Sequence, residues 1–327
     1  MATLITGGSG FIGLALAERL IADGETVFLF DLSAPAYGML ARPELAGATL
    51  ITGDVTSADD VDGALNEAGI DRVIHTAAMT PNEQRERDAA RQIVDVNIGG
   101  TVNLLECVAL RPAIKRVTVL SSVAVYGFSQ PAASGLFEEE LSPPAPAALY
   151  GITKLASEQA ALRIAQLHKL DVRVVRLGPA FGPWELQTAV RDALSPHHQI
   201  IALARAGREV ALPRTMAGDW IYSRDAARGI AAVSQADTLN HRIYHVSGGI
   251  ISNLVEWCVI VAQHFPDFIW KLAASQDDGN IIYRLPKDRA PLSIARLAGD
   301  TGCCPQFDLD AAARDYLGWL SLTGEPV

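Results

Sequence analysis

The sequence has 327 residues, of which 49% are hydrophobic and 20% charged, and its formal net charge is −10 at pH 7. A chain of this length can bury a large core in one domain or in two lobes. The acidic balance argues against nucleic acid as a partner, because binding a phosphate backbone needs clustered Lys and Arg. No apolar stretch reaches the length of a membrane span, so no membrane partner is expected.

Four cysteines are present, Cys107, Cys258 and the adjacent Cys303 and Cys304. Their spacing matches neither a zinc site nor a disulfide framework, so no metal is expected and a reducing compartment is favoured. The first apolar run begins at Ala2, which leaves no room for a signal peptide. These features together predict a cytoplasmic protein.

The N-terminal 24 residues read as strand, glycine turn and helix. Residues 2–6 are a short apolar run, glycines follow at G-x-x-G-x-x-G spacing, and a helical pattern then continues to Asp23-Gly24. Such glycines let the backbone approach a pyrophosphate, which sits at the helix N-terminus. The cofactor contacts expected from this turn are Gly7, Ser9, Gly10, Phe11, Ile12 and Gly13.

Three later strand ends supply further cofactor contacts. Asp31, followed by Leu32, closes the next strand, where a carboxylate accepts hydrogen bonds from an adenosine ribose and repels a 2′-phosphate. No arginine follows it, so NAD is favoured over NADP. The remaining contacts expected are Asp54 and Val55 near the adenine, and the small residues Ala77 and Ala78. His75 is interpreted as a packed residue at its strand end.

Strands alternate with helices through the first half of the chain, which predicts an α/β fold with a Rossmann-like doubly wound parallel sheet. The predicted strands are 2–6, 26–30, 48–52, 72–75, 114–120 and 172–177. Residues 1–178 form the predicted NAD-binding domain. Residues 179–327 form a smaller C-terminal substrate-binding lobe, with some strand and helix exchange back to the first domain.

The intervening segments are predicted as follows. Residues 79–88 form a polar loop, 88–110 one long helix with close packing or a bend at Gly99-Gly100, and the acidic run Glu138-Glu139-Glu140 a solvated loop. In the lobe, helices are expected at 184–206, 224–234, 253–264 and 309–320, and strands at 209–212, 219–222 and 243–246. His197-His198 lacks other ligands at metal spacing and is interpreted as a loop pair.

The candidate catalytic residues lie in the middle of the chain. Tyr150 and Lys154 are four residues apart, so they share one face of a predicted helix that continues to Lys169. A lysine ammonium there favours the phenolate form of the tyrosine, which can then exchange a proton with a substrate hydroxyl. Ser122 follows an apolar run and can hold the same substrate oxygen by a hydrogen bond.

With these residues assembled, the chain resembles the NAD-dependent sugar epimerase/dehydratase group of the extended short-chain dehydrogenase/reductase superfamily, over nearly its whole length. Residues 6–13 look like its cofactor turn, and Asn97 like its helix asparagine. Ser122, Tyr150 and Lys154 look like its catalytic serine, tyrosine and lysine. The resemblance implies NAD as cofactor, Asn97 as a fourth catalytic residue, and Tyr150, Lys154 and Pro179 as further cofactor contacts.

Departures from the family bear on the substrate. Val123 and Ala124 stand where dehydratases carry an Asp-Glu pair, which disfavours dehydration. Pro179, Gly218 and Leu285 replace the usual asparagine and arginines that anchor a nucleotide diphosphate, although Arg191, Arg214 or Arg289 can substitute. The expected substrate contacts are Ser122, Val123, Trp184 and Arg191.

The sequence therefore predicts an NAD-dependent oxidoreductase that takes a hydride from a secondary alcohol of a small polyhydroxylated substrate, such as a sugar, a sugar acid or a hydroxy acid. A nucleotide-sugar 4-epimerase is the alternative with the same chemistry, and a non-catalytic NAD-binding regulator is an alternative of another class. A homodimer is expected through the helices around 88–110 and 148–169.

Overall fold

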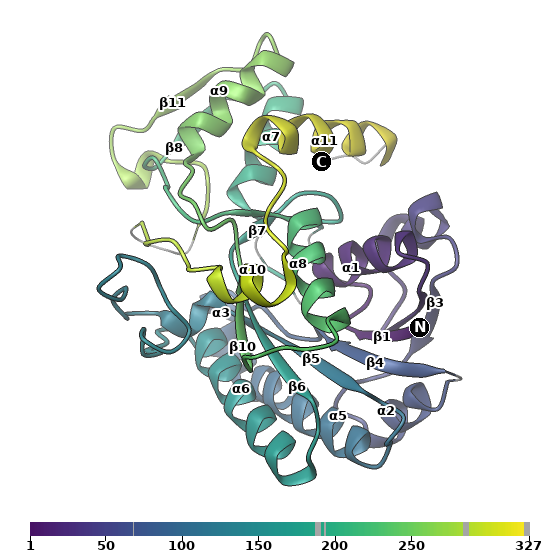
Figure 1. The fold of residues 1–327 in the computed structure, drawn as a ribbon. Helices are drawn as coiled ribbons and strands as arrows, with labels where there is room; N and C mark the ends of the chain where they lie inside the picture. Colours follow the sequence, from purple (N-terminus) through teal and green to yellow (C-terminus); the bar gives the residue numbers. More distant parts are fainter. Residues whose placement is uncertain (68, 187–190, 193, 284–287, 324–327) are drawn as a thin grey trace.

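The computed structural model describes residues 1–323, except 68, 187–190, 193 and 284–287. Its centre is a parallel sheet with strand order β3-β2-β1-β4-β5-β6-β10 (Figure 1). The strands are β1 Ala2–Thr6, β2 Thr26–Asp31, β3 Thr49–Thr52, β4 Ile70–His75, β5 Arg116–Ser122, β6 Val172–Leu177 and β10 Ile243–Val246. The predicted Rossmann-like doubly wound sheet is confirmed.

Helices cover both faces of this sheet, which explains why its strands are continuous apolar runs. All five residues of β1 are buried. In Figure 1, α1 Phe11–Ala22 and α8 Ser223–Gln235 lie on one face, packed against each other. On the other face lie α2 Ala58–Leu65, α5 Gly100–Ala109 and α6 Leu149–His168.

The strand order reverses between β1 and β4. From β1 the chain first runs outward through β2 and β3, and it then crosses back to β4, β5 and β6. Two crossovers therefore leave the sheet in opposite directions at this point. In open α/β sheets, such a switch point at the carboxyl ends of the strands is where ligands bind.

The segment before α5 differs from the prediction. The expected loop 79–88 contains α3 Glu83–Asp88, and Asn82 caps this helix by accepting a 2.8 Å hydrogen bond from the Arg85 N–H. The expected single helix 88–110 is broken into α4 Ala90–Val94, a π-helical turn Asp95–Gly99 and α5. The close packing predicted at the glycine pair is confirmed at Gly100, where an added Cβ would lie 2.7 Å from Val55.

The second lobe stands above the carboxyl edge of the sheet (Figure 1). It contains α7 Pro196–Arg205, β8 Val210–Leu212, α9 Leu254–His264, β11 Trp270–Leu272 and α11 Leu309–Thr323. Strand β8 pairs with β11, and β7 Ala180–Phe181 pairs with β9 Ile221–Tyr222. Helix α10 Ala295–Thr301 packs against α8 and β10, and the 3₁₀ helices are Ala36–Ala41, Pro43–Leu45, Val123–Tyr126 and Gln276–Asp278.

The helix predicted at 184–206 is wrong in its first half. Part of it, 187–190 and 193, lies outside the described residues, but Arg191 forms an isolated parallel bridge with Thr80. Helix α7 begins only at Pro196, after Ser195 caps it. The loop predicted for His197-His198 is therefore also wrong, because both histidines are buried in the first turn of α7.

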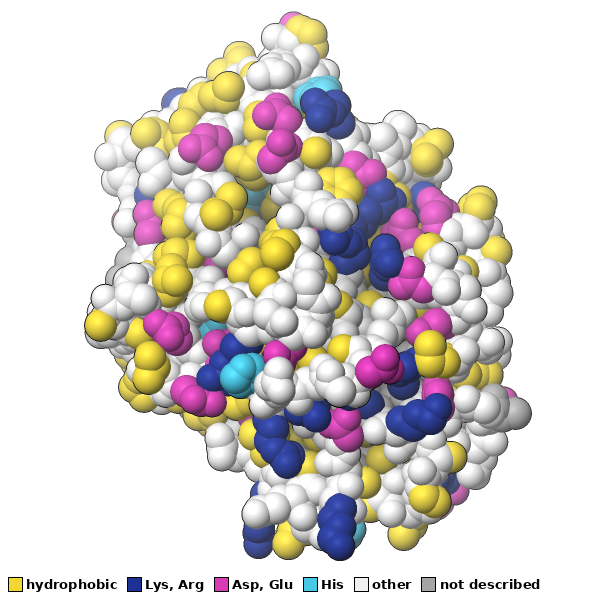
Figure 2. All heavy atoms as spheres, in the orientation of Figure 1, with side chains coloured by type: hydrophobic (Ala, Val, Ile, Leu, Met, Phe, Trp, Pro, Cys, Tyr) yellow, Lys and Arg dark blue, Asp and Glu magenta, His cyan; other side chains and the backbone are white. Residues whose placement is uncertain are grey.

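Acidic and basic side chains are interspersed on the face of the molecule shown in Figure 2. Among the helices that the structure describes, none combines the length and the hydropathy that a bilayer crossing requires. The described residues also contain no group of three or more His, Cys, Asp or Glu side chains arranged to hold a metal ion.

Candidate active site

A cavity of about 760 Å³ opens at the carboxyl edge of the sheet, between the two lobes. Its wall combines the ends of β1, β2, β4, β5 and β6 with the start of α6 and with segments of the second lobe. This volume lies within the range of ligand and cofactor sites. The cavity therefore occupies the place that the strand order predicts for a ligand.

The glycine turn between β1 and α1 forms one end of the cavity, through Gly7, Gly10, Phe11, Ile12 and Gly13. Gly7 has a φ of +68°, and a Cβ there would lie 2.7 Å from the Ala77 backbone. A Cβ at Gly13 would lie 2.4 Å from the Gly7 carbonyl oxygen. No side chain caps α1 at Gly10. The turn is thus a bare backbone cradle at a helix N-terminus, which suits a pyrophosphate.

Asp31 lies beside this turn, at the end of β2, and lines the cavity. Its carboxylate accepts hydrogen bonds from the Ser9 N–H (3.0 Å) and the Leu32 N–H (2.8 Å). Burial raises its pKa above the usual value, against the effect of these two donors. Ser9 does not line the cavity, and its contribution is to orient Asp31.

The other cofactor candidates lie along the same wall, with Leu32, Asp54, Val55, Ala77, Ala78 and Pro179 all lining the cavity. His75 stays outside it. This histidine is fully buried. Its Nδ1 lies 2.7 Å from the Thr6 hydroxyl oxygen, and its Nε2 lies 3.0 Å from the Thr101 hydroxyl oxygen. Burial lowers its pKa to about 3, so its ring is neutral. The packing role predicted for His75 is confirmed.

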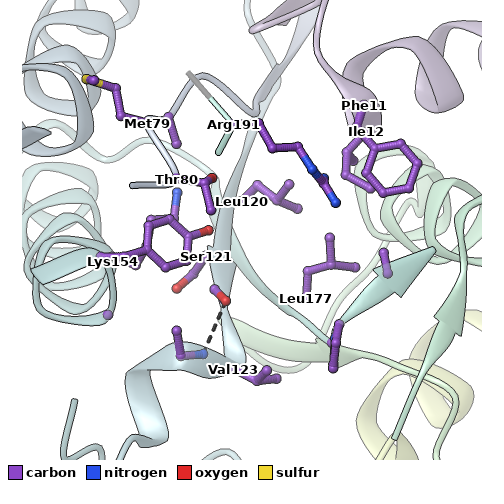
Figure 3. Close-up of a pocket in the computed structure, with 18 of the residues that line it drawn as sticks. Phe11, Ile12, Met79, Thr80, Leu120, Ser121, Val123, Lys154, Leu177 and Arg191 are labelled. Carbon is purple, nitrogen blue, oxygen red and sulfur yellow. Dashed lines mark hydrogen bonds between the residues drawn. The ribbon is translucent and has the colours of Figure 1, made fainter. Parts of the chain in front are cut away.

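Ser122, Tyr150 and Lys154 all line the cavity. Ser122 ends β5, and its hydroxyl accepts a 3.1 Å hydrogen bond from the Ala124 N–H. Tyr150 and Lys154 lie one turn apart at the start of α6. Lys154 is 3% exposed, and burial lowers its pKa to about 8, while the nearby Glu158 carboxylate acts in the opposite direction. Figure 3 labels Lys154 and Ser121 among the residues that line the cavity.

Asn97 does not line the cavity. It is buried in the π-helical turn, where its side-chain oxygen accepts from the Met79 N–H (2.7 Å). Its amide donates to the Met79 carbonyl (3.1 Å) and to the Thr153 hydroxyl (3.0 Å). This side chain therefore ties the segment after β4, which carries Met79, to the helix of Tyr150 and Lys154.

Two substrate candidates lie elsewhere than expected. Trp184 does not line the cavity, contrary to the prediction, because its indole is buried between α1 and α11, bonded to Glu18 (2.6 Å) and edge-on to Trp319. Arg191 does line it, but at the glycine turn, with its guanidinium 4.6 Å from the centre of the Phe11 ring. Figure 3 shows Arg191 directed toward Phe11 and Ile12.

The structure adds residues that the sequence did not assign to the site. Tyr283, Arg289 and Trp220 line the cavity from the second lobe, as do Met79 and Thr80 from the first. Gly218, where the resemblance expects an arginine, lines only a smaller adjoining cavity with Asp219. Burial raises the pKa of Asp219 to about 6 and that of Tyr283 to about 12. Of these residues, the sequence analysis singled out only Arg289, as a possible substitute for the arginines that bind a nucleotide diphosphate.

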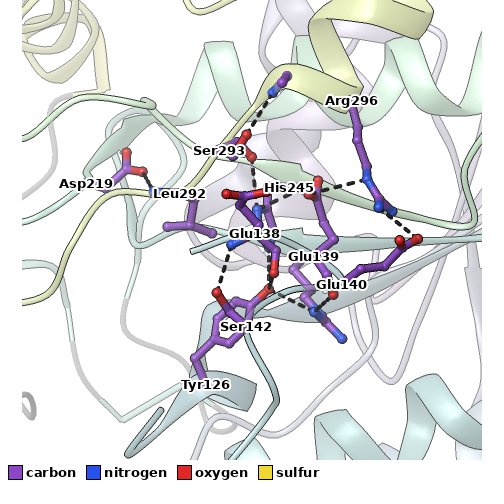
Figure 4. A network of polar contacts seen from close by, with 12 residues as sticks. Tyr126, Glu138, Glu139, Glu140, Ser142, Asp219, His245, Leu292, Ser293 and Arg296 are labelled. Carbon is purple, nitrogen blue, oxygen red and sulfur yellow. Dashed lines mark hydrogen bonds and ion pairs between the residues drawn. The ribbon is translucent and has the colours of Figure 1, made fainter. Parts of the chain in front are cut away.

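A buried polar network runs from Ser121, at the end of β5, toward α10 (Figure 4). Glu158 accepts a hydrogen bond from the Ser121 hydroxyl and pairs with Arg176 at 2.8 Å. Arg176 also donates to the Tyr126 hydroxyl, which lies 2.6 Å from His245 Nε2. Glu139 accepts from the His245 N–H at 3.0 Å. The solvated loop predicted for the acidic run is wrong at Glu139, which is 6% exposed, because it completes this network.

One cavity holds a bare glycine turn, a carboxylate at the end of the second strand and a Ser-Tyr-Lys set. This combination is typical of a dinucleotide-dependent enzyme of the short-chain dehydrogenase type. Residues 3–247 match the model of the NAD dependent epimerase/dehydratase family, and the chain belongs to that family. The family is NAD-dependent, and NAD is the cofactor of this enzyme.

Several relatives cover nearly the whole chain. A dTDP-L-rhamnose 4-epimerase of Burkholderia thailandensis is 24% identical over 97% of this chain and 94% of its own. A dTDP-6-deoxy-L-talose 4-dehydrogenase of Kitasatospora kifunensis is 26% identical over 96% and 89%. Among solved structures, UDP-glucose 4-epimerase of Thermotoga maritima has a TM-score of 0.81 at 19% identity, covering 99% of this chain and 100% of its own.

Proposed function

We propose that this enzyme is a dehydrogenase that oxidises a secondary alcohol of a small polyhydroxylated substrate: a sugar, a sugar acid or a hydroxy acid. The observation that carries the proposal is that Ser122, Tyr150 and Lys154 line the same cavity as the glycine turn. A proton-transfer group and a dinucleotide site are therefore continuous with each other.

Each residue of the set has a distinct role in the proposal. The Tyr150 phenolate takes the proton of the substrate hydroxyl as general base. Lys154 stabilises the phenolate through its ammonium charge, which it retains below its pKa of about 8. The Ser122 hydroxyl positions the substrate oxygen. Asn97 acts through Met79 and Thr153 rather than on the substrate. NAD, when bound, supplies the acceptor for the hydride.

The cofactor side of the cavity favours NAD over NADP. The Asp31 carboxylate accepts from the adenosine ribose in this proposal, and it repels a phosphate on the same oxygen. Gly7, Gly10 and Gly13 receive the pyrophosphate, and Ala77, Ala78 and Pro179 border the rest of the cofactor. Residues 1–178 thus bind NAD, and residues 179–327 complete the substrate side.

A 4-epimerase remains the second candidate, because B. thailandensis dTDP-L-rhamnose 4-epimerase is similar over nearly the whole chain. Dehydration is disfavoured, since Val123 and Ala124 carry no group that moves a proton. Pro179 and Gly218 also leave two of the usual diphosphate anchors without side-chain donors. These replacements favour a small substrate over a nucleotide sugar.

Release of free NADH during turnover tests the proposal. Purified enzyme with NAD is screened by NADH absorbance against sugar acids, free sugars and nucleotide sugars. A dehydrogenase accumulates NADH in proportion to product. If a nucleotide sugar is converted to its 4-epimer without net formation of NADH, the enzyme is a 4-epimerase and the dehydrogenase proposal is wrong.

We also propose that the enzyme is a cytoplasmic homodimer. Its four cysteines are unpaired, as in proteins of reducing compartments. The outward side of α6 is apolar at several positions, which supports pairing through this helix.

A further inference from the structure

We infer that Arg289 binds a carboxylate of the substrate, so that the substrate is a hydroxy acid or sugar acid whose acid group lies near the reacting carbinol. This inference rests on the proposed function. Arg289 lines the cavity from the second lobe. Its Nη1 donates to the Val123 carbonyl (3.0 Å) and its Nη2 to the Gly127 carbonyl (3.5 Å).

Both acceptors are neutral, so they satisfy donors of Arg289 without balancing its charge. Among the described residues, no carboxylate lies within ion-pair distance of Arg289, and its neighbour Asp288 pairs instead with Arg214. Burial lowers the pKa of Arg289. A half-buried cation held by neutral groups is costly unless an anion joins it. The geometry therefore leaves a place for an anionic group of a ligand.

Arg191 provides the contrast on the same wall. Its guanidinium donates to the Glu185 carboxylate, which is fully buried and accepts from the Ser195 N–H and hydroxyl, each at 2.6 Å. The charge of Arg191 is thus already balanced within the protein. It also lies at the glycine turn, over Phe11. Of the two arginines that line the described part of the cavity, Arg289 is the one suited to a substrate anion.

The segment that follows Arg289, residues 291–293, is held by two neighbouring parts of the chain. The Leu292 N–H donates to the buried Asp219 carboxylate at 2.8 Å, and Figure 4 shows these two residues facing each other. On the other side, the Phe137 N–H donates to the Pro291 carbonyl (2.9 Å) and the Ser293 N–H to the Phe137 carbonyl (2.8 Å). A guanidinium beside a segment fixed in this way loses little further freedom when it binds.

The position of Arg289 sets the distance between the acid group and the reacting carbon. Its acceptor, the carbonyl of Val123, belongs to the residue directly after Ser122, and consecutive Cα atoms lie about 3.8 Å apart. An anion on Arg289 is therefore expected on the part of the cavity wall that carries Ser122. One unbalanced guanidinium matches the single charge and planar shape of a carboxylate.

Substrate pairs that differ only in the acid group test this inference. The pairs are D-glucuronate with D-glucose and D-gluconate with D-sorbitol, and D-glucose 6-phosphate tests a phosphate. We expect the wild type to prefer an acid over its neutral partner. Arg289→Gln raises KM for that acid by about 10- to 100-fold, the value of a charge-assisted hydrogen bond, with kcat within a few-fold. Arg289→Lys restores part of the affinity.

Arg208→Gln is the matched control, because Arg208 is exposed on the second lobe and does not line the cavity. Its KM for the acid stays within about threefold of wild type. The affinity for NAD and the melting temperature of Arg289→Gln stay near wild type, which separates a binding defect from misfolding. Equal loss on acid and neutral substrates, or a stronger preference for the phosphate, would overturn the inference.

Binding measured without turnover keeps this test independent of the proposed function. Calorimetric titration of the acids into enzyme saturated with NADH reports on Arg289 even if no substrate is oxidised. If the acids bind in a way that depends on Arg289 but no NADH forms, only the proposed dehydrogenase activity is contradicted. Binding and turnover of the acids that are insensitive to Arg289→Gln would contradict only the carboxylate site.

Discussion

Lys154 and Tyr283 show how burial assigns different roles to two side chains of one cavity. Burial lowers the pKa of Lys154 to about 8, which keeps its charge at neutral pH but makes the charge costly. Burial raises the pKa of Tyr283 to about 12, which keeps that phenol protonated. Tyr283 can therefore donate a hydrogen bond, but it is no base at neutral pH, which leaves Tyr150 as the proton acceptor in the proposed mechanism.

Tyr150→Phe is expected to lower kcat by about 10² to 10⁴, because it removes the general base and leaves the ring in place. The affinity for NAD, measured by fluorescence titration, stays within about threefold of wild type. Tyr283→Phe is the control, since it removes a hydroxyl from the same cavity, and we expect it to retain at least a tenth of the wild-type rate. A Tyr150→Phe enzyme with similar retention would contradict the role of Tyr150.

Lys154→Met is expected to abolish turnover and yet stabilise the protein at pH 7, by about 1–3 kcal/mol, because it removes a buried charge. The sign follows from the pKa of Lys154, which is about 8 in the folded chain and 10.5 ordinarily. Between these values the unfolded chain holds a proton that the folded chain has released, so wild-type stability rises with pH.

The stability gap between Lys154→Met and wild type should therefore narrow from pH 8 to pH 10.5. Urea unfolding across this range measures it. Lys271→Met, at an exposed ion pair with Glu209, should leave stability within about 0.5 kcal/mol at every pH. If the difference in the free energy of unfolding instead widens with pH, burial of the charged Lys154 does not destabilise the fold.

Residues within short motifs could be placed from the sequence, and residues brought in from afar could not. Gly7, Asp31 and Lys154 lie where predicted, because each is fixed by its own strand end or helix turn. Trp184 was misplaced because its contacts are with Glu18 and Trp319, 166 and 135 positions away. No local pattern encodes such pairings.

At the scale of elements, the turn between β1 and α1 has no room for a single methyl group at Gly13. An added Cβ would meet the Gly7 carbonyl oxygen at 2.4 Å and the Gly8 Cα at 2.8 Å, and backbone atoms cannot move aside cheaply. We expect Gly13→Ala to lose about 1–3 kcal/mol of stability and most of the NAD affinity. Denaturant unfolding of the cofactor-free enzyme and NAD titration measure the two effects.

Gly63→Ala is the matched control for this prediction. Gly63 lies inside α2, and no atom lies within 4 Å of a Cβ built there. The substitution should raise stability by about 0.5–1 kcal/mol, the helix propensity difference, and leave NAD binding unchanged. Equal effects of the two alanines would show that the turn is not tightly packed.

Element boundaries were predictable where a strand end marked them. Strands β6 and β10 lie at the predicted residues, whereas the start of α7 at Pro196 was not predicted. The π-helical turn around Asn97 had no such signal. It depends on hydrogen bonds to Met79 and Thr153, which belong to other elements.

At the scale of the whole molecule, the two halves of the chain share one core. Strand β10 joins the sheet beside β6, and α8 packs on α1, as the predicted exchange between the halves requires. The buried network then connects the sheet to α10, where Arg296 pairs with Glu139 at 3.5 Å and with Glu140 at 2.8 Å. The cavity is therefore bounded by both halves of the chain.

The outward side of α6 carries a stripe that is apolar except for the exposed Arg163. Ile152, Ala156, Ala160 and Leu167 lie within about 80° of one another around the helix, and Ile152 and Leu167 are 48% and 59% exposed. If two copies pair through this stripe, a charge added within it should separate them. We expect the wild type to sediment as a dimer and Ile152→Glu/Leu167→Glu as a monomer.

Leu322→Glu is the control for the dimer, because Leu322 is 76% exposed at the end of α11 and belongs to a different element. It should leave the sedimentation coefficient at the dimer value. Because Ile152 lies between Tyr150 and Lys154 in sequence, a monomeric variant should also lose turnover if pairing rigidifies the start of α6. If the double variant sediments like the wild type at micromolar concentration, α6 is not the dimer interface.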